Sequence, residues 1–396
     1  GISLPEVGAT EAVLDFTSLL PQLMTNKGAT VTSTIEVDVK ANNRWASEDA
    51  TVNRVYTLKC NKPEFSIVTN PGNFWCKEFS VDSCDIKTGD IETISQKIQY
   101  QYRKKGDEQW INCDRLVQFD DYPVDKQYQI RAVYREGIET EPVDVMLETP
   151  QQLPNSDMEE WYIEEKKKSG TWPFKDKTYY TFHPYAEGNA SSSWWATNND
   201  KAQGGTYALG IWYEGCFASC VSYTEDAHGG TKAALMYLSG CGDGYANTAG
   251  TYVGGAMVGS LFIGTYDSGI IQGHDFDSRP TSMSFWYKYK PYNSDAFKVV
   301  VSLKNGDWEI ATGTYEPAAS SEEDGEYGHA TVDFNYTEPF EKATSICVQF
   351  LASNKTSLSQ SDFDLGTTIT YPVIGDWTVH MGSILKIDDI SLAFDK

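Results

Sequence analysis

The chain has 396 residues, a length that predicts two or three domains, each large enough to enclose a core. It carries 32 Lys and Arg residues against 56 Asp and Glu residues, so its formal net charge is −24. Such a surface repels nucleic acid, and we exclude a partner of that class. Aromatic residues make up 13% of the chain, which is typical of a folded protein.

The apolar runs of the sequence are short. Val299–Val301 and Ile384–Leu385 are examples, and a membrane-spanning helix needs about 20 apolar residues. We therefore expect no transmembrane segment. The chain starts at Gly1 without a methionine, and we interpret Gly1 as a cloning remnant, so that a signal or a lipid anchor ahead of it stays open.

Short alternating apolar runs, bounded by Gly, Asn, Asp and Pro, recur along the chain and predict an all-β fold. In the first half, the expected strands are Ile35–Lys40, Val55–Cys60, Ile98–Arg103, Tyr128–Tyr134 and Val143–Glu148. In the second half, they are Tyr207–Tyr213, Lys232–Ser239, Gly259–Gly264, Ser282–Tyr289, Lys298–Lys304, Asp307–Thr314, Ala330–Phe334, Ser345–Ala352 and Ile384–Ala393. One helix is expected over Glu11–Met24, where leucines follow a helical spacing that Pro21 interrupts.

A domain boundary is expected in the polar stretch Glu148–Asn155. It contains Pro150 and Pro154 and follows directly on a predicted strand. We therefore predict two domains, residues 1–152 and residues 153–396. All five histidines lie beyond this boundary, so recognition chemistry is expected in the second domain.

The eight cysteines leave two interpretations open. Their number is even, but eight in 396 residues is not the density of a disulfide scaffold. Three pairings are conceivable, and the alternative is a set of buried free thiols. The pairings are Cys76 with Cys84, Cys60 with Cys113, and Cys216 with Cys220.

The first domain resembles an immunoglobulin-like sandwich of the fibronectin type III kind. The resemblance rests on the strand Tyr128–Tyr134, which reads YQIRAVY, on Trp110 in the preceding hairpin, and on the closing Thr149-Pro150. It covers about 90 residues from Pro63 to Pro150. Domains of this kind are usually spacers or docking platforms, and we see no catalytic constellation in this one.

The ends of the second domain resemble those of jelly-roll carbohydrate-binding modules. The opening Asn155–Glu159 and the closing Leu385–Leu392 match the two chain ends of such modules, and Asp226–Leu235 matches their turn and strand. The segment from Leu261 to Pro291, with Arg279-Pro280 and the run Phe285–Tyr289, is similar to the putative carbohydrate metabolism domain family of Bacteroidetes.

This resemblance implies a larger β-jelly-roll sandwich after the immunoglobulin-like domain. It also implies export to the periplasm, outer membrane or cell surface, and a role in carbohydrate utilisation. The sequence departs from the family pattern around Cys216–Ser222 and in Gly240–Gly259, which leaves the shape of any pocket undefined.

The side chains of the second domain agree with a sugar site. Sugars stack their apolar faces on flat rings and bond their hydroxyl groups to amides, carboxylates or guanidinium groups. A predicted loop places the indoles of Trp194 and Trp195 close to the amide of Asn198. Further along the chain come the guanidinium group of Arg279 and two tyrosines on one face of a predicted strand. The candidate ligand-binding residues are therefore Trp194, Trp195, Asn198, Arg279, Tyr287 and Tyr289.

Each of these residues also has a structural interpretation. An aromatic residue on a sandwich strand is more often in the core than at a ligand, and this holds for Trp286 on the same strand. Because side chains alternate along a strand, Tyr287 and Tyr289 must share one face while Trp286 and Lys288 share the other. Arg279 could pair with a carboxylate such as Asp277 instead of meeting a sugar.

The resemblance to jelly-roll modules also implies a structural Ca²⁺ ion between the two chain ends. The matching oxygen ligands are Asp157, Glu159 and Asp389. The alternative is that these are surface acids near strand ends.

Catalytic candidates are weaker than binding candidates. The acidic run Glu322–Glu326 is expected to be a solvated loop, whereas Glu309, Asp362 and Asp364 alternate with apolar residues as strand carboxylates would. No nucleophile triad, HExxH motif or phosphate-binding loop is present in the sequence.

The sequence therefore predicts an exported monomer that binds an oligosaccharide or polysaccharide. Two alternatives remain open. One is a glycoside hydrolase or polysaccharide lyase that acts in a pocket of the jelly roll, and the other is a structural or adhesive surface protein.

Overall fold

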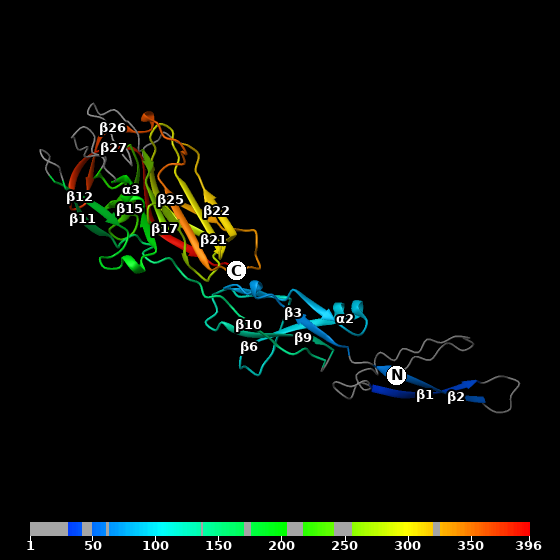
Figure 1. Cartoon of the computed structure of the whole chain (residues 1–396). Helices are drawn as coiled ribbons and strands as arrows, with labels where there is room; N and C mark the ends of the chain where they lie inside the picture. Colours follow the sequence, from blue (N-terminus) through cyan, green and yellow to red (C-terminus); the bar gives the residue numbers. More distant parts are fainter. Residues whose placement is uncertain are drawn as a thin grey trace. The chain divides into compact units, whose positions relative to one another are not determined.

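A computed structural model describes residues 31–41, 50–60, 63–135, 138–169, 176–203, 217–240, 256–319 and 325–396 (Figure 1). The chain divides into two compact units. The N-terminal unit comprises residues 1–74 and 78–147, and the C-terminal unit comprises residues 75–77 and 148–396. Among the described residues, no helix is long and apolar enough to span a membrane.

The N-terminal unit is built from short antiparallel strands. Its largest sheet has the order β10-β9-β6-β7, and two strand pairs, β3-β5 and β4-β8, accompany it. Its elements are β3 (Phe65–Val68), η2 (Pro71–Asn73), β4 (Glu78–Ser80), β5 (Ser83–Ile86), α2 (Ile91–Lys97), β6 (Ile98–Lys104), β7 (Ile111–Cys113), β8 (Leu116–Gln118), β9 (Gln127–Tyr134) and β10 (Val143–Met146).

Alternation along β9 explains how this unit closes. Tyr128, Ile130 and Ala132 are buried, and the residues between them are more exposed, so one face of the sheet meets the core. The core also takes Phe79 and Val117 from the pair β4-β8. Two further strands, β1 (Val31–Ala41) and β2 (Ala50–Cys60), pair with each other in antiparallel register.

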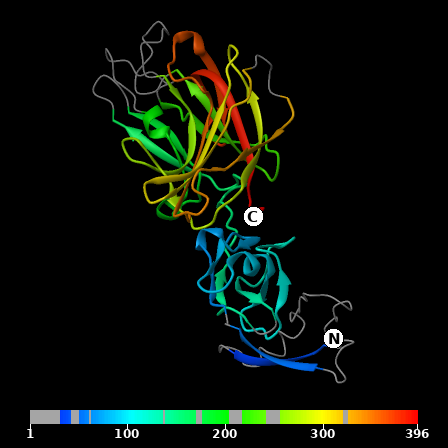
Figure 2. The ribbon, with the colours of Figure 1, turned by 90° about the vertical axis from the view of Figure 1, so that its right-hand side faces the viewer.

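The C-terminal unit contains two large antiparallel sheets, which Figure 2 shows turned by 90°. In the first sheet the described strands run β13-β17-β25-β21-β22-β24, with β18 paired to β17 and β19 to β25. Their bounds are β13 (Trp195–Thr197), β17 (Ser260–Tyr266), β18 (Ile270–Gln272), β19 (His274–Asp275), β21 (Lys298–Asn305), β22 (Trp308–Tyr315), β24 (Asn335–Tyr336) and β25 (Ser345–Leu351).

In the second sheet the described strands run β14-β15-β27-β20-β23, with β16 paired to β15 and β26 to β27. Their bounds are β14 (Val221–Thr224), β15 (Ala233–Ser239), β16 (Met257–Val258), β20 (Ser282–Lys290), β23 (Gly328–Asp333), β26 (Asp364–Tyr371) and β27 (Gly375–Ala393). A separate pair, β11 (Tyr162–Lys168) and β12 (Lys177–His183), and the short helices η3 (Ala190–Ser192), α3 (Asn199–Ala202) and η5 (Gln360–Asp362) complete the unit.

One apolar core joins the two large sheets. Leu261, Val301 and Phe350 from the first sheet and Met283 and Leu385 from the second are fully buried in it. Burial of this apolar surface is the main free energy that holds the sheets face to face. The predicted all-β fold with sandwich architecture is confirmed, and the immunoglobulin-like character of the N-terminal unit stays a prediction.

Several predicted elements differ from the structure. The predicted strand Ile384–Ala393 is the end of a much longer strand, β27, and the predicted loop around Trp195 contains the strand β13. The pair β11-β12 and the helix α2 are not among the predicted elements. The predicted helix Glu11–Met24, the strand Tyr207–Tyr213 and most of the acidic run Glu322–Glu326 lie outside the described residues.

The cysteine pairings are wrong wherever the structure describes a partner. Cys76, Cys84, Cys113, Cys220 and Cys347 form no disulfide, and Cys76, Cys220 and Cys347 are buried. Each conceivable pairing includes one of these five. Burial raises the pKa of the Cys220 thiol to about 12, so this group is a small apolar core residue and not a nucleophile.

Candidate functional site

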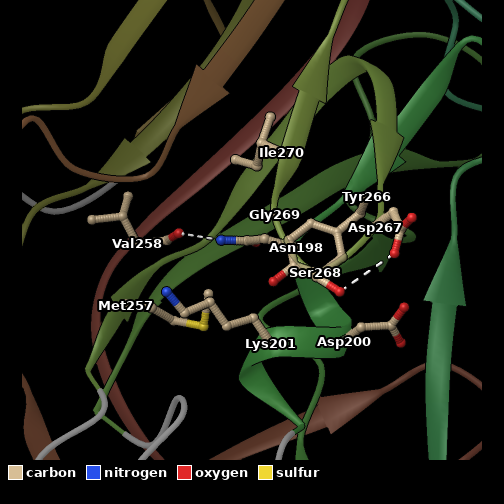
Figure 3. A pocket seen from close by; sticks show the side chains of 10 residues that line it. All are labelled: Asn198, Asp200, Lys201, Met257, Val258, Tyr266, Asp267, Ser268, Gly269 and Ile270. Atoms are coloured by element: carbon tan, nitrogen blue, oxygen red, sulfur yellow. Dashed lines mark hydrogen bonds between the residues drawn. The ribbon is translucent and has the colours of Figure 1, made fainter.

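A groove with a cavity volume of about 710 Å³ lies in the C-terminal unit between α3 and the hairpin of β17 and β18 (Figure 3). We name it the Tyr266 groove. Its wall combines a tyrosine ring with carboxylates, an ammonium group, an amide and a hydroxyl group. The lining residues are Asn198, Asp200, Lys201, Met257, Val258, Tyr266, Asp267, Ser268, Gly269 and Ile270.

The local sequence explains how the hairpin presents its polar residues. Tyr266 pairs with Ile270 across the hairpin, so the loop is the three residues Asp267, Ser268 and Gly269. Ser268, the middle residue of the loop, has a φ of 56°, in the left-handed region that tight turns use. The Asp267 N–H donates to the carbonyl oxygen of Gly269 at 3.0 Å, which closes the loop and holds its side chains at the groove.

Asn198 lines the groove but its amide is committed to the protein. Its Nδ2 donates to the Val258 carbonyl oxygen at 2.8 Å, and its Oδ1 accepts from the Ser260 N–H at 2.9 Å and from the Cys220 thiol at 3.4 Å. The residue is 5% exposed. Asn198 therefore positions the groove wall next to α3, and its predicted role as a direct sugar ligand is replaced by this positioning role.

A second cavity of about 200 Å³ adjoins the groove, because Asp200 and Tyr266 line both. His183 and Tyr185 also line the second cavity, and their rings lie 5.2 Å apart. The ring of Tyr162 stacks on His183 with centroids 5.8 Å apart. The second cavity is therefore lined by the rings of His183, Tyr185 and Tyr266, together with that of the core residue Trp195.

A network of charges lies beside this second cavity. Lys166 Nζ donates to Asp200 Oδ1 at 2.8 Å and forms an ion pair with Glu164 Oε2 at 3.4 Å. The same Glu164 oxygen lies 2.9 Å from His183 Nε2. Burial, followed by the negative charges of Glu164 and Asp200, raises the pKa of Tyr185, so its hydroxyl group stays protonated and can donate.

Sequence reasoning missed these residues. Asp200, Glu164 and His183 come from three separate elements, α3, β11 and β12, and no short motif links them. The signal that was available is the run Glu164–Lys168, in which acids and bases follow one another along an edge strand. Such a run is more often a solvated face than a site, and only the pairing of β11 with β12 places it at a cavity.

The two predicted indoles lie in different environments. Trp195 is 2% exposed, packs in the main core, and donates its indole N–H to the Pro154 carbonyl oxygen at 2.8 Å. Its predicted contact with a ligand is therefore wrong, because the ring faces the other sheet. Trp194 is half-buried and stacks on His274 with ring centroids 4.1 Å apart, so one of its faces is already covered.

Arg279 is buried and saturated by protein acceptors. Its side chain is fully buried, Nε donates to Glu148 Oε1 at 2.8 Å, and Nη1 donates to the carbonyl oxygens of Pro339 at 2.8 Å and Glu341 at 3.3 Å. The predicted sugar contact is wrong. The alternative of a carboxylate partner is what the structure contains, with Glu148 in place of Asp277.

Tyr287 and Tyr289 also face inward. Their rings lie 4.9 and 5.1 Å from the buried ring of Phe297, and both pack against the main core. The predicted alternation is therefore confirmed, but the two tyrosines occupy the core face and not a ligand face. Trp286 and Lys288 lie on the opposite, outer face of the same strand.

The residues expected to hold Ca²⁺ are engaged with protein donors. Glu159 Oε1 accepts from the N–H groups of Thr231 and Lys232 at 2.5 and 2.9 Å, and its Oε2 accepts from the Thr231 hydroxyl at 2.6 Å. Asp389 Oδ2 lies 2.6 Å from His228 Nδ1. Asp157 is exposed.

These contacts do not fit a cation site. Donors occupy the oxygens that a cation would need. Within the described ranges, no group of three or more His, Cys, Asp or Glu side chains is arranged to hold a metal ion. The calcium ion remains a proposal from the family resemblance.

The carboxylates expected as catalytic candidates do not form a pair. Glu309 is exposed on β22 in the first sheet, while Asp364 starts β26 in the second sheet. Asp362 Oδ1 accepts from Lys355 Nζ at 2.6 Å, and its other oxygen caps η5 through Ser359. Asp362 is therefore a structural carboxylate.

No family model matches this sequence, and no curated protein matches it. The fold is similar to that of a carbohydrate-binding module of the β-sandwich superfamily, at 10% identity and a TM-score of 0.25, covering 84% of this chain and 98% of the other. A carbohydrate-binding module in complex with β-1,4-galactotriose matches at 11% identity and a TM-score of 0.23, covering 50% of this chain and 86% of the other.

A putative sugar binding protein from Bacteroides thetaiotaomicron matches at 10% identity and a TM-score of 0.23, covering 50% of this chain and 87% of the other. Identities and TM-scores of this size are too low to transfer a ligand or a mechanism. Membership in the Bacteroidetes family stays a prediction, and the proposals below rest on the residues of this chain.

Proposed function

We propose that the C-terminal unit binds a glycan in the Tyr266 groove. The observation that carries this proposal is the wall of the groove, where one aromatic ring lies among the side chains of Asp200, Lys201, Asp267 and Ser268. A ring that can stack on a sugar and polar groups that can bond its hydroxyls are the two requirements of sugar recognition. A concave site with a few convergent polar groups is also the usual location of a ligand.

The charges of the groove favour a neutral glycan. Asp200 and Asp267 contribute two carboxylates to the wall and Lys201 contributes one ammonium group. Lys166 pairs with Asp200, so the Asp267 carboxylate is the group that would repel a carboxylated sugar, whereas hydroxyl groups can donate to it. An oligosaccharide or polysaccharide of neutral sugars is therefore the proposed ligand.

A second candidate function is glycan cleavage in the adjoining cavity. The observation in its favour is that the carboxylates of Asp200 and Glu164 both form ion pairs with the ammonium group of Lys166. His183 Nε2 is hydrogen-bonded to the same Glu164 oxygen. Two carboxylates close to each other are the working groups of glycoside hydrolases. In that role, one carboxylate would take a proton from water as the water oxygen adds to the anomeric carbon, and the other group, as a carboxylic acid, would give its proton to the leaving oxygen as the glycosidic C–O bond breaks.

The cellular setting belongs to the same proposal. Export to the periplasm or cell surface, a possible lipid anchor ahead of Gly1, a monomeric state and a role in carbohydrate utilisation are expectations that follow from the family resemblance. This expected setting agrees with a glycan ligand, because an exported protein encounters polysaccharides outside the cytoplasmic membrane.

The test is a soluble-glycan array on the whole chain, followed by a reducing-sugar assay on each glycan that binds. We expect retention of neutral glycans, and a loss of at least about tenfold in affinity for Tyr266→Ala and for Asp267→Asn, equivalent to ~1.4 kcal/mol. Ile271→Ala is the matched control, because Ile271 is 55% exposed on the same hairpin and does not line the groove.

Three outcomes separate the functions. Binding without product release establishes a binding module. Product release that Glu164→Gln or Asp200→Asn abolishes would instead promote the hydrolase. Absence of binding to any glycan would contradict both and favour the structural or adhesive role.

A further inference from the structure

Two lysines lie directly opposite each other on the outer face of the second sheet. Lys288 on β20 pairs with Lys386 on β27 in antiparallel register. Their flanking residues Tyr287 and Leu385 belong to or pack against the core, so both lysine side chains stand on the other face. We name Lys288 and Lys386 the lysine pair.

The lysine pair is unusually enclosed for lysines. The side chains are 15% and 14% exposed. Like charges directly opposite on neighbouring strands destabilise a sheet, and removal from water increases their repulsion. An arrangement of this kind requires an anion between the two ammonium groups.

A loop carboxylate supplies that anion. Asp226, in the connection between β14 and β15, accepts from Lys288 Nζ at 2.9 Å through Oδ1 and from Lys386 Nζ at 2.7 Å through Oδ2. Asp226 itself is 45% exposed. One carboxylate therefore bridges both ammonium groups from the solvent side, at a position where an external carboxylate could take its place.

Aromatic side chains border the lysine pair. Trp286 lies two residues before Lys288 on the same face, with His228 stacked on its indole at 3.8 Å and His329 at 5.0 Å. Tyr327 lies on the other flank, where Lys288 Nζ is 4.8 Å from the ring centroid. The Tyr327 hydroxyl donates to the Asp226 carbonyl oxygen at 2.7 Å, and His228 Nδ1 lies 2.6 Å from Asp389 Oδ2. These aromatic groups therefore hold the Asp226 loop beside the lysine pair.

We propose that the lysine pair is a second glycan site, specific for a uronic acid residue, and that Asp226 occupies the position of the sugar carboxylate when no glycan is bound. In the complex the uronate carboxylate bridges Lys288 and Lys386, and the Asp226 loop moves aside. No covalent bond is made or broken; the ion pairs of Asp226 with the two lysines are exchanged for those of the uronate. The site differs from the Tyr266 groove in its residues and in the charge of the sugar it takes.

The lysine pair recognises one sugar carboxylate at a time. The net charge of the chain is −24, so the protein as a whole adds no long-range attraction, and the lysine pair holds a carboxylate only through short-range contacts. A uronate carries one carboxylate per sugar together with hydroxyl groups and an apolar ring face, which suits the ring-bordered position.

The experiment measures binding of the whole chain to polygalacturonate at low and high salt, with a neutral polymer for comparison. We expect Lys288→Met to lower affinity for polygalacturonate at least tenfold, because methionine keeps the stem and removes the charge. Asp226→Asn should raise the affinity several-fold, because the competing carboxylate is gone. Raising the salt concentration should weaken binding.

Lys290→Met is the matched control, since Lys290 is an exposed lysine two residues further along the same strand. An equal loss in this variant and in Lys288→Met would overturn the proposal, because it would show attraction to any surface lysine. Absence of polygalacturonate binding by both the unaltered chain and Asp226→Asn would overturn it as well. The Asp226→Asn variant is expected to gain affinity for polygalacturonate, and a misfolded protein would not show such a gain.

The two proposed sites can fail separately. Tyr266→Ala should abolish binding of neutral glycans and leave polygalacturonate binding unchanged, whereas Lys288→Met should do the reverse. Loss of polygalacturonate binding in Tyr266→Ala, with its melting temperature unchanged, would place the uronate in the groove and contradict the second site.

Discussion

The guanidinium group of Arg279 donates from Nε to the carboxylate of Glu148 at 2.8 Å, and both side chains are almost completely buried. Lys342 Nζ binds the same Glu148 oxygen at 2.7 Å, and the ring of Trp75 lies 3.7 Å from the Arg279 guanidinium carbon. Glu148 Oε2 is buried and has no hydrogen-bond partner in the described part of the chain. The carboxylate therefore depends on its cationic neighbours.

We predict that Arg279→Met lowers the free energy of unfolding by about 3–5 kcal/mol, because it leaves the Glu148 carboxylate buried without its main partner. The double variant Arg279→Met with Glu148→Gln should lose less than the sum of the single variants, since neither member of the buried pair then remains charged and Lys342 is partly exposed. Urea denaturation of the three variants measures this. Strict additivity would contradict a coupled buried pair.

The two tryptophans should differ in how much each contributes to stability, with Trp195 contributing more than Trp194. Trp195→Ala is expected to cost about 3–5 kcal/mol of stability, because it opens a cavity in the main core. Trp194→Ala should cost less, since that ring is only half-buried. Thermal melts of both variants check this, and a Trp195→Ala protein that melts like the unaltered chain would argue against the core position.

Asp226 gives a prediction for acid pH. The hydrogen bond from Lys386, and that from Lys288, hold the pKa of the Asp226 carboxyl below its ordinary value of 3.8. A lowered pKa stabilises the fold above the ordinary value, and this contribution is lost as the pH falls through the folded-state value. The stability difference between the unaltered chain and Asp226→Asn should therefore shrink below about pH 4 and also in high salt.

Urea titrations at a series of pH values, each at low and high salt, measure that difference. The effect should be small, because Asp226 is 45% exposed. A difference that grows on acidification would reverse the sign and exclude the ion pairs as its source.

The calcium ion implied by the family resemblance would make excess EDTA lower the melting temperature of the C-terminal unit, whereas the donors on the Glu159 and Asp389 oxygens predict an unchanged melt. Differential scanning calorimetry of the whole chain, with EDTA and with added Ca²⁺, measures this. An unchanged melt would show that the N–H and O–H donors around Glu159 and the histidine beside Asp389 satisfy these carboxylates by themselves. Glu159→Gln should then leave the response to EDTA unaltered.

Much of the fold could be predicted from local patterns. The strand around Tyr128 reads as alternating apolar and polar residues, and β9 occupies Gln127–Tyr134. The opposite faces of Trp286 and Tyr287 also follow from one strand, because successive side chains point to opposite sides. The pair β11-β12 escaped prediction because Glu164–Lys168 carries charges at successive positions and lacks the apolar period.

The candidate site could not be predicted in the same way. The Tyr266 groove joins α3 to a hairpin more than 60 residues further along the chain, and its wall is defined only when β13 pairs with β17. The lysine pair likewise depends on β20 lying beside β27, which are separated along the chain by residues 291–374. Neither association leaves a motif in the linear sequence.

The sequence by itself determined the all-β class, the strand positions and the alternation of faces, because these follow from the geometry of the extended chain and the spacing of apolar residues. Only the tertiary structure decided which face is buried. Arg279 and Tyr287 resemble ligand residues in composition, yet the opposing sheet and Glu148 enclose them. Burial depends on what packs against a strand, and that partner is supplied by distant residues.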